Sequence, residues 1–170
     1  MKQLIVLLLI FLNLNAFGTK YYVKDQGNDN NSGLSDDQAW AHHPWMIGWT
    51  GQVILKPGDS VCMKRDCIWR IEKPLTHFIT VKQSGTKGNY ITTTVYGTGL
   101  KPLIFISTND EPSVIYGNGK SYIKFDNLEI RHCSSTKSTQ GRCGIQFGET
   151  LGLVSHDWII TNCEIHDCPF

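Results

Sequence analysis

Two glutamates occupy the same position in a phrase that the chain repeats. Residues 121–133 read SYIKFDNLEIRHC and residues 156–168 read HDWIITNCEIHDC, so Glu129 and Glu164 stand 35 residues apart in matching register. Hydrolysis of a glycosidic bond needs two carboxylates flanking that bond, and two like charges on neighbouring strands could raise one pKa. An arginine or a histidine follows two residues after each glutamate. We therefore expect a solvated ladder of acidic and basic side chains at this place.

The cysteines offer a second kind of chemistry. They stand at positions 62, 67, 133, 143, 163 and 168. The spacing Cys-x4-Cys occurs twice with histidines nearby, as zinc could use, but stacked or bridged cysteines are the simpler interpretation. Cys133 and Cys168 are equivalent in the two copies, and neighbouring strands lie ~4.8 Å apart, within reach of a disulfide. Closure of the loop from Cys133 to Cys143 is an equally simple pairing. No cofactor is evident.

An acidic and amide-rich run near the start of the chain could supply oxygen ligands for Ca2+. The run contains Asp25, Asn28, Asp29, Asn30, Asn31, Asp36 and Asp37. Its order does not follow the EF-hand pattern, and these side chains also form turns with their own backbone, so we favour turns. Ser35 and Gln38 read as a capping box, which predicts a short helix. Trp40, Trp45 and Trp49 could close the first apolar layer or, alternatively, form an aromatic platform for carbohydrate.

The repeated phrase must be positioned by β-structure. Apolar and polar residues alternate on both sides of Asn127 in the first copy and of Asn162 in the second. This alternation is typical of strands with one buried face, and Asn tolerates the left-handed backbone of a tight corner. A unit that recurs every few tens of residues indicates stacked repeats. In such a stack the amides of Asn127 and Asn162 would bond one above the other.

An earlier pair of segments extends the repeat. SVIYGNG at 113–119 matches GIQFGET at 144–150, with Val114 opposite Ile145 at an offset of 31 residues. Each repeat would then hold three short strands, which predicts an all-β fold. The predicted strands lie near residues 113–117, 121–126, 128–133, 144–148, 157–161 and 163–168.

The start of the chain indicates export. Residues 1–18 combine a basic beginning, an apolar run and small residues at the cleavage position, as a secretory signal peptide does. The run is too short to span a bilayer, so we expect no membrane span and a secreted, periplasmic or cell-surface protein. A net charge of +1 argues against nucleic acid as a partner. The rest divides into an N-terminal lead-in and cap at 19–50 and stacked repeats at 51–170.

Several phrases, in order, resemble the right-handed parallel β-helix of pectate-lyase-like secreted proteins. YYVKDQGNDNNSG at 21–33 is similar to the start of these proteins, LKPGDSVCMKRDCIWR at 55–70 to their first coil, and SGTKGNYITTTVYGTGLKPLI at 84–104 to their second. The resemblance implies a single-stranded β-helix with three strands per coil and a short N-terminal capping helix. The family includes polysaccharide lyases, glycoside hydrolases, epimerases and phage or surface proteins, so the resemblance does not choose a reaction.

The resemblance also implies where a substrate would bind. In such proteins a groove on one outer wall carries the chemistry, and in this register Ile115 and Gln146 point outward from that wall. The candidate substrate-binding residues there are Lys82, Lys137, Arg142, Gln146 and Glu149. A lyase needs a base together with a cation or Ca2+, and a hydrolase needs two carboxylates. This wall offers Glu149 alone, so no catalytic residue is assigned.

Two functions are compatible with the resemblance. The first is an exported polysaccharide-processing enzyme, a lyase or a glycoside hydrolase, whose substrate we expect to be acidic. Its catalytic coils, with any Ca2+ site, would lie beyond residue 170. The second is a non-catalytic β-helix that serves as a surface adhesin or phage-type scaffold. The chain stops directly after a predicted strand, so we expect a truncated protein that is inactive alone.

Overall fold

The computed structural model describes residues 18–71, 77–106, 113–132, 143–147 and 154–168, and in these residues the protein is all-β, as predicted. The strands are β1 (Lys20–Val23), β2 (Ser60–Lys64), β3 (Ile68–Ile71), β4 (Ile79–Thr80), β5 (Ile91–Tyr96), β6 (Leu103–Ile106), β7 (Ser113–Tyr116), β8 (Ile123–Asp126), β9 (Glu129–His132), β10 (Cys143–Gln146), β11 (Trp158–Thr161) and β12 (Glu164–His166). No helix long and apolar enough to cross a lipid bilayer occurs in this part of the chain.

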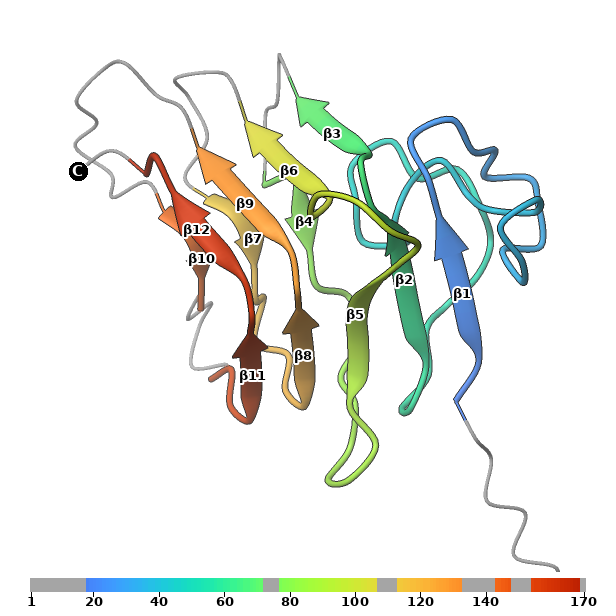
Figure 1. The fold of residues 1–170 in the computed structure, drawn as a ribbon. Coiled ribbons are helices and arrows are strands. Elements are labelled where there is room, and N and C mark those ends of the chain that lie inside the picture. Colours follow the sequence, from blue (N-terminus) through green and yellow to red (C-terminus); the bar gives the residue numbers. More distant parts are fainter. Residues whose placement is uncertain (1–17, 72–76, 107–112, 133–142, 148–153, 169–170) are drawn as a thin grey trace, which may run out of the picture.

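The strands build three sheets in which all paired strands run parallel. The first sheet has the order β1-β2-β5-β8-β11, the second β10-β7-β4 and the third β12-β9-β6-β3. The successive strands β7, β8 and β9 lie in three different sheets, and β10, β11 and β12 return to the same sheets beside them. Figure 1 shows this progression from β1 at one end to β11 and β12 at the other. The parallel sheets make the fold β-helix-like.

The repeated phrase pairs in the predicted register. Ile160 lies beside Phe125 in the first sheet, and Ile165 lies beside Ile130 in the third. All six strands predicted for the two repeats are present, with ends that differ from the prediction by no more than two residues. Phe125 and Ile130 belong to the continuous apolar core that runs through the described residues.

The predicted offset of 31 residues between β7 and β10 is wrong. Ile145 pairs with Ile115, and Gln146 pairs with Tyr116, at an offset of 30 residues. Ile115, which we expected to point outward, is buried in the core, as is its neighbour Val114. The apolar pattern could not decide the register because Ile145 has an apolar partner in either alignment, Val114 or Ile115.

Asn127 and Asn162 form the corners that join β8 to β9 and β11 to β12, as predicted. Their φ angles of 68° and 54° lie in the left-handed region, which Asn tolerates better than most residues. The predicted bond between the two amides does not form. Instead, Asn162 Nδ2 donates to Asp126 Oδ1 at 2.9 Å. Thr161 Oγ1 donates to the same oxygen at 2.8 Å, so Asp126 joins the corners of the two repeats.

The predicted N-terminal capping helix is wrong, because the described lead-in forms turns instead. The Gln38 N–H donates to Ser35 Oγ at 3.3 Å, as in a capping box, but the Gly33 N–H donates to the Gln38 carbonyl at 2.8 Å and folds the segment back. Gly33 has a φ of 73° and packs on the Trp40 ring, where a Cβ would lie 2.4 Å from a ring carbon. The ring thus holds a tight loop in place of a helical turn.

The acidic run forms turns, as predicted. Asp29 Oδ1 accepts hydrogen bonds from the backbone N–H groups of Ala41 at 3.0 Å and His42 at 2.9 Å. Asp29 Oδ2 lies 2.8 Å from His42 Nδ1. Trp40 and Trp45 are almost completely buried in the same segment, where they close the apolar layer next to the first strands.

Cys62, Cys67 and Cys163 are free thiols. Cys133 lies outside the described residues, and so does the side chain of Cys143. The two pairings considered for Cys133, with Cys168 or with Cys143, therefore stay predictions.

A buried histidine fastens the lead-in to the first sheet. The Trp45 N–H donates to His43 Nδ1 at 3.0 Å, so Nδ1 is unprotonated and Nε2 donates to Thr93 Oγ1 at 3.1 Å. Complete burial, with a smaller effect of the Lys82 charge, lowers the pKa of His43 to about 3. The folded protein therefore holds this imidazole neutral at pH values where an exposed imidazole would be charged.

Replacing Asn162 separates the two roles of this corner residue. Asn162→Gly loses the hydrogen bond to Asp126, but glycine adopts a positive φ without steric cost. Asn162→Leu loses the same bond and also places a leucine in the left-handed region, where its Cβ causes strain. We expect free energies of unfolding lowered by ~0.5–1 kcal/mol for Gly and by ~1–3 kcal/mol for Leu. Urea unfolding measures both, and an Asn162→Leu protein as stable as the parent would contradict the assigned role.

Acid should destabilise the protein through His43. Its folded pKa is about 3 and its unfolded pKa is about 6.5, so between these values only the unfolded state takes up the proton. The contribution of neutral His43 to the free energy of unfolding is fully present above pH ~6.5. It falls by ~1.4 kcal/mol per pH unit as the pH drops toward 3. Urea unfolding from pH 7 to 4 should give a shallower pH dependence for His43→Gln than for the parent. Parallel curves would show that His43 takes up its proton over the same pH range in the folded and the unfolded protein, and would contradict the lowered pKa.

Candidate functional site

The described residues include only two of the five side chains predicted to line the groove, Lys82 and Gln146. Lys82 is exposed, and its Nζ donates to the Pro44 carbonyl at 2.8 Å. Gln146 stands at the end of β10, with its Oε1 buried and without a hydrogen-bond partner. The other three candidates, Lys137, Arg142 and Glu149, lie outside the described residues. The groove therefore stays a prediction.

The outer face of the third sheet carries the predicted charge ladder. Glu129 and Glu164 pair in register on β9 and β12. Lys101 Nζ lies 2.6 Å from Glu164 Oε1, and His166 Nε2 lies 3.1 Å from Glu129 Oε1. The hydrogen bond and charge of Lys101 lower the pKa of Glu164, so this carboxyl is ionised near neutral pH. A hydrolytic pair needs one protonated carboxyl, so this pair suits a structural ladder better than catalysis.

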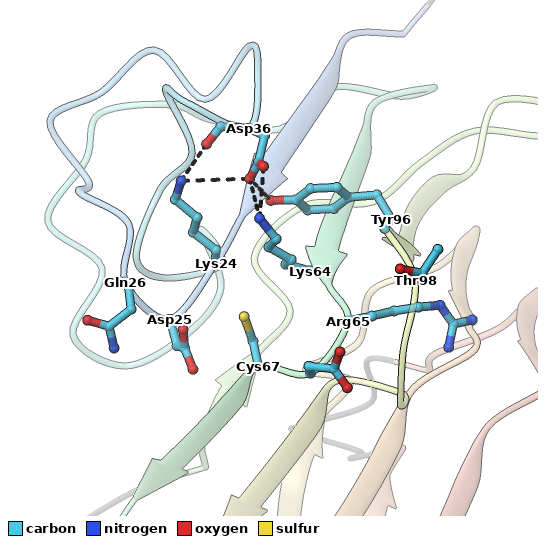
Figure 2. A pocket seen from close by; sticks show the side chains of 11 residues that line it. Lys24, Asp25, Gln26, Asp36, Lys64, Arg65, Cys67, Tyr96 and Thr98 are labelled. Atoms are coloured by element: carbon cyan, nitrogen blue, oxygen red, sulfur yellow. Dashed lines mark hydrogen bonds and ion pairs between the residues drawn. The ribbon is translucent and has the colours of Figure 1, made fainter.

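A cavity of about 660 Å3 opens at the corner between the first and third sheets. The lead-in, the turn from β2 to β3 and the turn after β5 contribute its walls. We call it the corner pocket. It is lined by Lys24, Asp25, Gln26, Asp36, Lys64, Arg65, Asp66, Cys67, Tyr96, Gly97 and Thr98. Figure 2 shows polar side chains converging on it from these segments.

Asp36 joins the lead-in to the strands at one wall of the corner pocket. Lys64 Nζ donates to Asp36 Oδ2 at 2.8 Å, and the Tyr96 hydroxyl donates to Asp36 Oδ1 at 2.7 Å. Lys24 Nζ donates to the Asp36 carbonyl at 2.8 Å. One carboxylate thus receives donors from β2 and β5, and the dashed lines of Figure 2 converge on it.

The opposite wall is formed by two further carboxylates and an arginine. Asp66 Oδ1 accepts from the Leu100 N–H at 2.8 Å, and Asp25 Oδ2 accepts from the Ile68 N–H at 3.2 Å. Arg65 Nη1 donates to the Gly99 carbonyl at 3.0 Å. A Cβ on Gly99 would lie 1.9 Å from Asp66 Oδ2, so only glycine leaves room for this carboxylate.

The electrostatics of the corner pocket suit binding more than proton transfer. Hydrogen bonds from Lys64 and Tyr96 lower the pKa of Asp36, and the bond to Asp36 raises the pKa of Lys64. Burial raises the pKa of Cys67 and, together with Asp36, that of Tyr96. A general acid or base works best with a pKa near the operating pH. All four shifts move the groups away from neutrality, so their protonation states are fixed.

No single pattern in the sequence indicated the corner pocket. Its lining comes from four segments, 24–26, 36, 64–67 and 96–98, which become neighbours only when the sheets form. Two of the pocket's carboxylates, Asp25 and Asp36, belong to the acidic run, which we assigned to turns. No group of three or more His, Cys, Asp or Glu side chains in the described part of the chain is arranged to hold a metal ion.

Comparison with known proteins shows a likeness of fold. No protein-family model matches the chain, and no curated protein matches it. A native lacto-N-biosidase of glycoside hydrolase family GH136 from Eubacterium ramulus superposes with a TM-score of 0.60 and 22% identity over 85% of this chain and 26% of that chain. Its selenomethionine derivative gives 0.58 and 23% over 86% and 26%. The chain therefore spans about a quarter of the length of these structures.

Removing the charge of Asp36 should loosen the lead-in. Asp36→Asn loses the ionic part of the bonds from Lys64 and Tyr96, and we expect a loss of ~1 kcal/mol at pH 7 because the site is partly exposed. Since the folded pKa is lowered, this contribution exists above pH ~3.8 and disappears as acid titrates the carboxylate.

The matched control for this variant is Asp37→Asn, one residue away. Thermal unfolding at pH 7 should separate the two variants, and the difference should shrink at pH 2–3. Equal melting temperatures at pH 7 would contradict the role of Asp36.

Proposed function

We propose that this protein is an exported carbohydrate-processing protein of the glycoside hydrolase kind, built on a right-handed β-helix with three strands per coil. Residues 1–18 would direct export. Residues 113–132 and 143–168 would each form one coil, and the catalytic carboxylates would belong to coils beyond residue 170. The likeness to a lacto-N-biosidase supports a hydrolase more than a pectate lyase.

The uncovered end of the stack is the observation that carries the proposed position of the catalytic coils. Phe125 and Ile130 are 0% exposed because strands lie on both sides of them. Their register partners Ile160 and Ile165, on the last strands, are 37% and 44% exposed. In the same repeat, Gln146 Oε1 and Ser155 Oγ are buried without a hydrogen-bond partner. The exposed core positions favour a further coil against β11 and β12, whereas the two buried polar atoms are already enclosed.

The chemistry of hydrolysis also favours catalytic groups elsewhere. A glycoside hydrolase needs one protonated and one ionised carboxyl at a separation of ~5–9.5 Å. In the described residues, Lys101 binds Glu164, and Lys64 and the Tyr96 hydroxyl bind the Asp36 carboxylate. These bonds lower the pKa of Glu164 and of Asp36, so both carboxyls are poor sources of a catalytic proton.

A non-catalytic β-helix that binds carbohydrate is the second candidate. The fixed protonation states of the corner pocket favour it, because binding requires no group that titrates near neutral pH. In this case the protein would act as an adhesin or scaffold, and no further coil would add hydrolytic activity.

The protein of residues 19–170 should show no turnover. The assays are release of nitrophenol from a panel of nitrophenyl glycosides that includes the lacto-N-bioside, and ultraviolet detection of unsaturated product from pectin with and without Ca2+. We expect signals equal to the enzyme-free blank. Turnover that Glu149→Gln abolishes would place the active site within this chain and overturn the proposal.

The coding sequence after residue 170 supplies the positive test. The proposal expects further repeats with paired Asp or Glu residues at outward positions, and release of sugar by the protein that includes them. Repeats without such carboxylates, and no release, would favour the binding scaffold.

A further inference from the structure

We propose that the corner pocket binds a neutral saccharide through pairs of adjacent hydroxyl groups, with Asp25 and Asp66 as acceptors. This inference rests on the proposed carbohydrate function and departs from the acidic substrate expected from the sequence. The pocket's volume of about 660 Å3 lies within the range of ~300–1,000 Å3 that is common for small-molecule sites.

The charge balance of the corner pocket disfavours an anionic ligand. Three cations and three carboxylates line it, so it has no excess positive charge. Lys24 and Lys64 both bind Asp36, which leaves Arg65 as the cation on the opposite wall. A uronate or sulfate group would have to approach Asp25 and Asp66 against like-charge repulsion.

The remaining hydrogen-bonding capacity matches neutral hydroxyl groups. An ionised carboxylate accepts several hydrogen bonds, and Asp66 uses Oδ1 for the Leu100 N–H while its Oδ2 has no partner in the described residues. Asp25 Oδ2 accepts from the Ile68 N–H at 3.2 Å and can accept further hydrogen bonds. Arg65 spends one N–H on the Gly99 carbonyl and can donate others to a sugar oxygen. Adjacent sugar hydroxyls donate to carboxylates and accept from arginine.

The acceptors are fixed before any ligand arrives. The Leu100 N–H holds Asp66, and the missing Cβ of Gly99 leaves the space in which the carboxylate lies. Asp36 holds the lead-in, with Asp25, against β2 and β5. Groups that are already in place lose little conformational freedom on binding, which favours affinity for a small polar ligand.

A glycan array of tri- and tetrasaccharides provides the test. The protein of residues 19–170 is labelled and applied at pH 7 and 0.15 M salt to neutral glycans and to uronate and sulfated glycans of equal length. We expect binding to one or more neutral glycans and weaker or no binding to the acidic ones. Binding confined to acidic glycans, or to none, would overturn the proposal.

Two variants place the binding in the corner pocket. Asp66→Asn removes the ionised acceptor, and Gly99→Ala displaces the same carboxylate from a different residue. Calorimetric titration with the neutral glycan selected on the array should show at least ~10-fold weaker binding for both. Asp37→Asn is the control and should bind like the parent. Unchanged affinity in a folded Asp66→Asn protein, judged by its circular dichroism, would exclude the pocket.

The outcome is independent of the test of hydrolysis. In one outcome, a longer protein hydrolyses glycans while its Asp66→Asn variant still binds neutral glycans with unchanged affinity. This result would contradict the pocket assignment and leave the proposed function intact. Neutral glycan binding that depends on Asp66, with no hydrolysis by the longer protein, would do the reverse.

Discussion

The parallel pairing of each strand with its counterpart in the next repeat is the constraint on which the rest of the structure depends. Because β11 must lie beside β8 and β12 beside β9, the corner between them must recur at the same place with the same backbone. Asn127 and Asn162 meet this condition with positive φ. The same register places equivalent residues of the two repeats side by side. Apolar residues therefore meet apolar residues in the core, and Glu129 lies beside Glu164 on the outside. The charge of Lys101 beside Glu164 offsets their repulsion, and His166 Nε2 lies within hydrogen-bond distance of Glu129.

This constraint also decides where the chain can build a site. Within the strands, the backbone groups are hydrogen-bonded to the neighbouring strands. Polar groups that can still bond a ligand therefore lie at the corners between strands and along the lead-in. The corner pocket is an example, because its walls come from turns and from a segment that Asp36 fastens to β2 and β5. Ile160 on β11 and Ile165 on β12 are partly exposed because these strands lie at the edges of their sheets in the described residues.

The sequence predicted the elements that repeat and missed those that do not. β8, β9, β11 and β12 were found because thirteen consecutive residues share one pattern, which leaves a single register. β7 and β10 were found as strands but aligned one residue out, because Ile145 fits beside either of two apolar neighbours. The capping helix failed because the capping box is a local signal, whereas the packing of Gly33 on Trp40 is a tertiary one. The corner pocket is formed entirely by such tertiary contacts, so no local sequence pattern predicted it.

Residue-resolved hydrogen exchange of the backbone amides tests the parallel stack with an uncovered last repeat most directly. In a parallel ladder, successive N–H groups of a strand point to opposite neighbours. All amides of β8, which lies between β5 and β11, should therefore exchange slowly. In β11 only alternate amides, those that face β8, should be protected, and the others should exchange rapidly at the open edge. Uniform protection along β11, or rapid exchange throughout β8, would contradict this arrangement of the strands.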